Sequence, residues 1–189
     1  MAVCITMVGY VSSGKTTTIK NLPALSEMEI LNTDNYIFSL VDSGEYPDYP
    51  SAFAEKRNAA NKMFKRRIDE IAAQETDVII DRINLNINSR NRLFATLPAH
   101  EHICINIRTD FNTALKRYNE LEEHYKQPEQ PNYYRNIPRH LLSQMANDLE
   151  VPSMDEGYKC IINIDENGKF LFMTGEETPL ANSILMQLD

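Results

Sequence analysis

The 189-residue chain has no tryptophan and only three cysteines, Cys4, Cys104 and Cys160. Each cysteine lies inside an apolar run, and their spacing fits neither a metal-binding cluster nor a set of disulfides. We therefore expect reduced, buried thiols, as in cytoplasmic proteins. This scarcity of cysteine argues against a small secreted domain that disulfides hold together.

Long hydrophobic runs are missing as well. No apolar stretch approaches the roughly 20 residues that a membrane-spanning helix requires, and the first residues do not resemble a signal peptide. Positive charge is also in deficit, because 19 Lys and Arg stand against 27 Asp and Glu, for a net charge of −8. These features predict a cytoplasmic protein without membrane contact, and they argue against a long binding track for duplex nucleic acid.

Positive charge does gather in one segment, residues 55–67, where six Lys and Arg residues accompany a single acidic residue. Lys62 and Arg66 are four positions apart and would share one face of a helix. Arg66 is therefore a candidate for holding a phosphate of a substrate. An ordinary solvated helix face is the alternative explanation of the same charges.

A clear motif is present at residues 9–16, GYVSSGKT, directly after the apolar run AVCITMV. The pattern G-x-x-x-x-G-K-[ST] is that of a phosphate-binding loop between a strand and a helix. In such a loop the glycines let the backbone wrap around phosphates, which the helix N-terminus and the lysine attract. We expect ATP, or GTP, to bind here with Mg²⁺, and Ser13 either supports the loop or faces solvent. The predicted nucleotide ligands are Gly9, Ser12, Ser13, Gly14, Lys15, Thr16 and Thr17.

Strand-like apolar runs alternate with helical stretches along the whole chain. Strands are predicted at residues 2–8, 29–32, 77–81, 102–107 and 159–164, and helices near 15, at 51–74, 88–97, 110–124 and 139–150. This alternation predicts one α/β domain, residues 1–189, with a five-stranded parallel sheet in a three-layer fold. The phosphate loop indicates a P-loop NTPase, and we expect the kinase-type form of that fold. Asn167-Gly168 predicts a turn into an added antiparallel strand, so that residues 159–189 would form a C-terminal hairpin and helix. Ser51 is the predicted N-cap of the long helix.

Two carboxylates come where predicted strands end, at the edge where parallel sheets bind ligands. Asp81 can orient the water shell of Mg²⁺ beside the Thr16 hydroxyl, or it can cap the next segment. Asp34 can take the proton of an attacking hydroxyl, or it can cap the helix that follows. Lys15, Asp34 and Asp81 thus predict phosphoryl transfer, with Thr16 and Asp81 as the metal ligands.

The residues around these carboxylates resemble a known family, the 5′-hydroxyl polynucleotide kinases in their phage-type kinase domain. The resemblance lies in the phosphate loop, in Asn32-Thr33-Asp34 and in VIIDRINLNINSRNR (78–92), and it extends over about residues 1–152. It implies ATP-dependent transfer to a 5′-hydroxyl end of RNA or DNA, as in nucleic acid repair, with Asp34 as general base. Asn84 and Arg90 match the signature after the third strand and are candidate substrate contacts.

The segments ALKRYNEL (114–121) and IPRHLLSQMANDLEVP (137–152) resemble the family's lid-flanking region. The resemblance implies a lid at about residues 122–138 and makes Arg117 the lid arginine that contacts the transferring phosphoryl group. Arginine suits that role because its planar fork can clamp two phosphate oxygens. The second lid arginine expected from the family is Leu121 here, so Lys126 and Arg135 are candidates to replace its charge.

Further departures from the family pattern are Ile37, in place of an arginine after the base, and Ile83, in place of a threonine. Two alternatives therefore stay open beside the polynucleotide kinase. One is a small-molecule kinase that acts on a nucleoside or nucleotide. The other is a nucleotide-gated partner-binding protein without an acceptor. The oligomeric state and the donor base preference are not indicated by the sequence.

Overall fold

A six-stranded sheet, in the order β2-β3-β1-β4-β5-β6, forms the centre of the computed structural model, which describes residues 1–188. The first five strands are parallel, and β6 runs antiparallel to β5. The predicted kinase-type P-loop fold is confirmed, including the antiparallel addition at the sheet edge. The strands are β1 (Val3–Val8), β2 (Glu29–Leu31), β3 (Val78–Ile80), β4 (Glu101–Arg108), β5 (Cys160–Asp165) and β6 (Phe170–Gly175).

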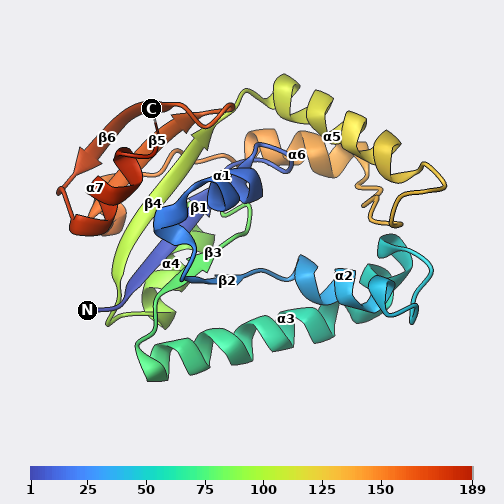
Figure 1. The fold of residues 1–189 in the computed structure, drawn as a ribbon, viewed down its shortest axis with the longest axis horizontal. Coiled ribbons are helices and arrows are strands. Elements are labelled where there is room, and N and C mark those ends of the chain that lie inside the picture. The colour runs from blue at the N-terminus through green and yellow to red at the C-terminus, as the bar shows by residue number, and fades with distance from the viewer. Residues whose placement is uncertain (189) are drawn as a thin grey trace.

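Helices cover both faces of this sheet (Figure 1). One face carries α1 and α7, and the other carries α3 and α4. Within residues 1–188, no helix combines the length and the apolar character needed to cross a bilayer. The helices are α1 (Lys15–Asn21), α2 (Asp34–Asp42), α3 (Tyr49–Gln74), α4 (Ile87–Thr96), α5 (Phe111–Tyr125), α6 (Arg139–Asn147) and α7 (Pro179–Leu185), with 3₁₀ turns at Pro23–Leu25 and Met154–Glu156.

The core explains why the inner strands are apolar along their whole length. Ile5 and Ile105 point to one face and pack against Ile19 of α1, whereas Cys4 points to the other face and packs in the same cluster as Ile68 of α3. Strands that are buried on both faces read as continuous apolar runs. A few buried polar residues interrupt these runs, such as Asn106 and Asn163, which pair with each other, and the candidate functional side chains follow the strand ends.

The long helix α3 begins at Tyr49, two residues before the predicted start. Its N-cap is Asp48, whose carboxylate accepts a hydrogen bond from the Ser51 amide at 2.8 Å, so the prediction that Ser51 is the cap was wrong. Pro50 stands in the first turn, where its missing N–H costs no helical hydrogen bond. The earlier start turns Tyr49 from a loop residue into the first residue of a rigid helix.

Residues 126–138, between α5 and α6, form an irregular segment that we call the lid. In Figure 1 the lid descends from the end of α5 toward the connection between α2 and α3. The carbonyl of Asn132 accepts from the Tyr49 amide at 2.9 Å, and its side chain donates to the Pro47 carbonyl at 2.8 Å. Tyr134 donates its hydroxyl to Asp48 at 3.2 Å. These contacts dock the lid on the N-terminus of α3.

Candidate active site

The loop between β1 and α1 has a backbone shaped for wrapping around phosphates. Gly9 and Gly14 have φ angles of 153° and 106°, and Ser12 has a φ of 58°. A Cβ atom at Gly9 would lie 2.6 Å from the Ser13 hydroxyl, so this position needs glycine for space as well as for conformation. Gly14 directly precedes α1 and leaves the first amides of that helix open to an anion.

Two serine hydroxyls of the loop fit a phosphate ligand. The Oγ atoms of Ser12 and Ser13 are buried and have no hydrogen-bond partner within residues 1–188. Buried polar atoms in native proteins almost always have a partner. Hydroxyls that are left over in a loop of this shape can donate to phosphate oxygens. These observations favour a role for Ser13 in supporting the loop or binding phosphate over the solvent-facing alternative.

Lys15 lies folded back over the loop. Its Nζ donates to the carbonyls of Gly9 at 3.1 Å and Tyr10 at 2.6 Å. Burial lowers the pKa of Lys15 to about 8, although the nearby Asp81 carboxylate favours the charged form. A triphosphate would replace weak carbonyl partners by full negative charges, and would thereby return the ammonium to its ordinary protonation range.

Thr16 and Asp81 make a pair that fits Mg²⁺. The Thr16 hydroxyl donates to Asp81 Oδ2 at 2.8 Å. Asp81 does not cap the next helix, because α4 is capped by Asn86, whose side chain accepts from the Ser89 amide. Within residues 1–188 no group of three or more His, Cys, Asp or Glu forms a metal cage. A hydroxyl and one carboxylate suit Mg²⁺, which keeps several waters and binds phosphates. The neighbouring Thr17 lies exposed in the first turn of α1.

Asp34 is held from two sides. Its Oδ1 accepts from the Tyr49 hydroxyl at 2.9 Å, and its Oδ2 accepts from Arg135 Nη2 at 2.6 Å. The carboxylate does not cap α2, because the Asn32 side chain accepts from the Asn35 amide at 2.8 Å instead. The Asp34 side chain remains 33% exposed. A partly open carboxylate in a fixed orientation can receive a proton from a substrate hydroxyl.

Arg135 is the lid candidate that the structure brings to this carboxylate. Its guanidinium lies 5.8 Å from the ring centres of both Phe38 and Tyr49. The Arg135 amide donates to Glu122 at 2.6 Å, which anchors the lid to α5. Arg135 is also close enough to Lys15 to disfavour its charge. Its Nε is buried without a partner in the described part of the chain, so the guanidinium has a donor to spare.

Arg117 lies on the other side of the phosphate loop. Its guanidinium donates to the Glu166 carbonyl at 2.6 Å and to the Asn167 side chain at 3.2 Å, in the turn between β5 and β6. That carbonyl is 3.7 Å from the point where a Cβ atom at Gly14 would stand. Arg117 therefore borders the start of α1 and lies on the nucleotide side, apart from the Asp34 group.

Two candidates from the sequence support the fold and do not face the site. Arg90 is fully buried and pairs with Glu156 through two hydrogen bonds of 2.6 and 2.8 Å. Its Nη1 donates to the carbonyls of Asn84, Leu85 and Glu150. The Asn84 side chain donates to the Met7 carbonyl at 2.9 Å. We correct the substrate-contact prediction for both residues, because Arg90 is fully buried with its donors bonded inside the protein, and Asn84 is buried with its amide nitrogen bonded to backbone carbonyls.

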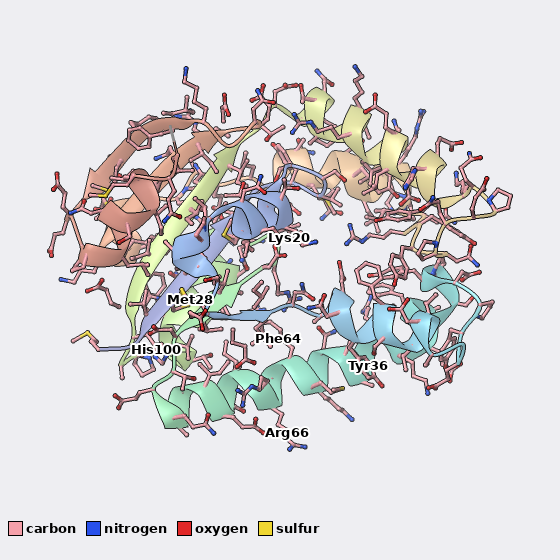
Figure 2. All side chains as sticks on the ribbon, viewed as in Figure 1. Lys20, Met28, Tyr36, Phe64, Arg66 and His100 are labelled. Carbon is pink, nitrogen blue, oxygen red and sulfur yellow. The ribbon has the colours of Figure 1, made fainter. Side chains whose placement is uncertain are left out.

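Arg66 and Lys126 are surface charges. The Arg66 side chain is 84% exposed and pairs with Glu70, one turn along α3. Figure 2 shows Arg66 on the side of α3 that faces away from the sheet, opposite Phe64. Lys126 pairs with Glu123 at 2.9 Å. The expectation that Arg66 or Lys126 contacts the substrate is corrected in favour of the solvated-face alternative.

Two residues at the site were missed by sequence reasoning. Tyr49 contacts Asp34 through its hydroxyl, and this contact depends on the start of α3. The other is Arg82, whose guanidinium carbon lies 4.8 Å from the centre of the Phe64 ring. The Arg82 side chain is exposed on its outer side, its partial burial lowers the pKa of the guanidinium, and the charge of Asp34 opposes this shift. The usable signal for Arg82 was its position directly after Asp81, at the ligand-binding edge of the sheet.

A family model described as an AAA domain (AAA_33) matches residues 4–162. The match covers most of the chain, which therefore belongs to this family. It ends within β5, so β6 and α7 lie beyond it. No curated protein matches the sequence.

Solved structures share the fold over nearly the whole chain. A structure from the PezAT chromosomal toxin–antitoxin system of Streptococcus pneumoniae is 18% identical, with a TM-score of 0.65 over 100% of this chain and 78% of that chain. Kti12 of Chaetomium thermophilum, in complex with ADP-AlF3, is 15% identical, with a TM-score of 0.58 over 97% and 96%. A fungal RNA kinase is 14% identical, with a TM-score of 0.50 over 99% and 82%. At such identities the likeness concerns the fold.

Proposed function

We propose that this member of the AAA domain family is an ATP-dependent kinase that transfers the γ-phosphoryl group to a hydroxyl. A phosphate loop alone would serve an ATPase or a molecular switch equally well. The observation that carries the proposal is the Asp34 carboxylate, which Tyr49 and Arg135 hold in place at the same end of the sheet as Lys15. A base in that position is needed for transfer to an alcohol.

The donor side binds and neutralises the phosphates of ATP. The loop amides and the serine hydroxyls surround them, and Lys15 offsets their charge. Thr16 and Asp81 would hold Mg²⁺, which supplies further charge neutralisation when bound. Arg135, beside Asp34, provides the lid charge that Leu121 does not. Arg117 borders the nucleotide from the opposite side.

On the acceptor side, Asp34 receives the proton of the acceptor hydroxyl, and the oxygen of that hydroxyl attacks the γ-phosphorus of ATP. The bond from that phosphorus to the bridging oxygen breaks, and ADP leaves with the electron pair. The proton passes from Asp34 to solvent. Phosphoryl transfer requires chiefly positioning and charge neutralisation, which is what these side chains offer.

The first acceptor to consider is a 5′-hydroxyl end of RNA or DNA, which the sequence resemblance implies. A nucleoside or nucleotide is the second, and one observation favours it. Arg66, the candidate for holding a substrate phosphate, projects away from the site on the outer face of α3, which leaves fewer positive charges for binding a long nucleic acid. A small acceptor needs only the charges close to Asp34, namely Arg82 and Arg135.

The test is transfer of labelled γ-phosphate from ATP to a 5′-hydroxyl oligonucleotide, and in parallel to nucleosides and nucleotides. Lys15→Ala should abolish transfer to whichever acceptor is labelled by the wild type. Asp34→Asn should lower transfer by about 10²- to 10⁴-fold and retain ATP affinity. Release of free phosphate at an equal rate in the wild type and Asp34→Asn, with no acceptor labelled, would contradict a kinase and support the partner-binding alternative.

A further inference from the structure

We infer that Tyr49 is a positioning residue for the Asp34 carboxylate, and that docking of the lid on α3 controls this positioning. The inference rests on the proposed function, because it presupposes that Asp34 is the base. Tyr49 does not touch the reacting atoms in this account. It acts through Asp34 alone.

The hydrogen bond from Tyr49 fixes one of the two carboxylate oxygens. The Tyr49 hydroxyl donates to Oδ1 at 2.9 Å, while Arg135 donates to Oδ2 at 2.6 Å. Burial, and after it the charge of Asp34, raises the pKa of the Tyr49 phenol, which therefore stays a donor at neutral pH. One donor on each oxygen prevents rotation of the carboxylate, and each oxygen keeps a lone pair for a substrate proton.

The Tyr49 ring is itself immobilised by packing. Tyr49 is 4% exposed, and its ring stacks on the Phe53 ring with 5.6 Å between the ring centres and an interplanar angle of 15°. The centre of the Phe38 ring lies 5.3 Å from that of Tyr49. A residue that positions a catalytic group must have its own rotamer locked in this way. A phenylalanine would fill the same space, so the hydroxyl serves the Asp34 carboxylate and the ring serves the packing.

The lid docks on the same residue that holds Asp34. The Tyr49 amide is one of the first amides of α3, which have no partner within the helix, and it donates to the Asn132 carbonyl of the lid. Arg135 follows three residues later and takes the other carboxylate oxygen. Undocking of the lid would therefore remove the Arg135 donor from Asp34. It would also break the bond between the Tyr49 amide and the lid, so that the second donor to Asp34 would be held less firmly. The base is fully oriented only when the lid is docked.

The experiment compares Tyr49→Phe with Tyr36→Phe. Tyr36 packs in the same cluster as Tyr49, and no hydrogen bond of its hydroxyl is found within residues 1–188, which makes it a matched control. We expect Tyr49→Phe to lower kcat about ten- to a hundredfold, because a hydrogen bond to a charged group is lost. KM for ATP should stay at the wild-type value, and Tm should fall by no more than a few degrees. Tyr36→Phe should leave all three unchanged.

A double-mutant cycle with Asp34→Asn separates positioning from packing. If Tyr49 acts through Asp34, Tyr49→Phe changes the residual rate of Asp34→Asn by less than about twofold. Additive losses would overturn the inference, as would a larger fall in Tm together with a raised KM for ATP. An unchanged kcat in Tyr49→Phe beside an inactive Asp34→Asn also overturns it and leaves the proposed function intact. Wild-type transfer by Asp34→Asn would instead contradict the proposed function.

Discussion

The two halves of the candidate active site are built differently. The centre of the donor side is a single continuous segment, residues 9–16, in which Lys15 bonds to carbonyls only five and six positions away, and Asp81 joins it from the end of β3. The acceptor side is assembled from three segments, since Asp34 meets Tyr49 at a separation of 15 positions and Arg135 at a separation of 101. A self-contained donor side can keep its nucleotide while the acceptor side is disturbed. Binding and transfer should therefore be separable by mutation.

The largest separation is expected from Asp34→Asn. Loss of a general base should lower transfer by about 10²- to 10⁴-fold, while ATP affinity stays at the wild-type value. Labelled-phosphate transfer and calorimetric titration with ATP measure the two quantities. Asp69→Asn, at an exposed position on α3, is the matched control and should change neither. A parallel loss of ATP affinity in Asp34→Asn would break the proposed separation of the two sides.

Arg90→Leu should weaken both sides of the site together, because it lowers the stability of the fold that holds them. It leaves the Glu156 carboxylate, 1% exposed, without its partner. Breaking a buried ion pair in this way typically costs about 3–5 kcal/mol of unfolding free energy. Denaturant unfolding measures it, with Arg66→Leu as the control, expected within about 0.5 kcal/mol of wild type. Unchanged stability in Arg90→Leu would contradict the structural role given to this pair.

Arg135 of the lid and Arg117 of α5 should divide along the same line. Arg135→Ala should lower kcat about a hundredfold with little change in KM for ATP, because Arg135 lies at Asp34. Arg117→Ala should raise KM for ATP with a smaller effect on kcat, because Arg117 borders the start of α1. Steady-state kinetics with varied ATP distinguishes the two. The reverse pattern would mean that the assignment of these arginines to the two sides is wrong.

The smallest expected effect is a pH dependence of ATP affinity, which concerns the donor side alone. Burial lowers the pKa of Lys15 to about 8, so its ammonium loses its proton as pH rises through this value. ATP affinity should be constant below about pH 7 and fall above pH 8, by at most tenfold per pH unit, with proton uptake on binding. Calorimetry in buffers of different ionisation enthalpy measures both. In Lys15→Arg, whose guanidinium stays charged, the decline should be absent.

The donor side was largely accessible to sequence reasoning because its contacts are local. The spacing of Gly9, Gly14, Lys15 and Thr16 is dictated by a loop that must turn tightly, so the pattern carries the geometry with it. The sheet was also readable, since strands buried on both faces leave continuous apolar runs. The ends of those runs indicated that Asp81 lies at the ligand-binding edge, where the structure has it.

The acceptor side was less accessible because its partners are distant in the chain. That Arg135 and not Lys126 meets Asp34 depends on how the lid folds over α3, which no local pattern records. Arg90 was misread because a buried arginine and a substrate-binding arginine look alike until Glu156 is placed beside it. Arg66 was misread because four-residue spacing defines a helix face without saying whether the face is turned inward.

The long reach between Asp34 and Arg135 has a consequence for how the protein folds. The base acquires its second donor only after a loop of 101 positions has closed, and the entropy cost of closing a loop rises with its length. The strand that carries the phosphate loop has equally distant partners, since Val3 of β1 pairs with Glu101 of β4. Both sides of the site therefore depend on contacts between distant parts of the chain, and neither is complete in a partly folded molecule that lacks these contacts.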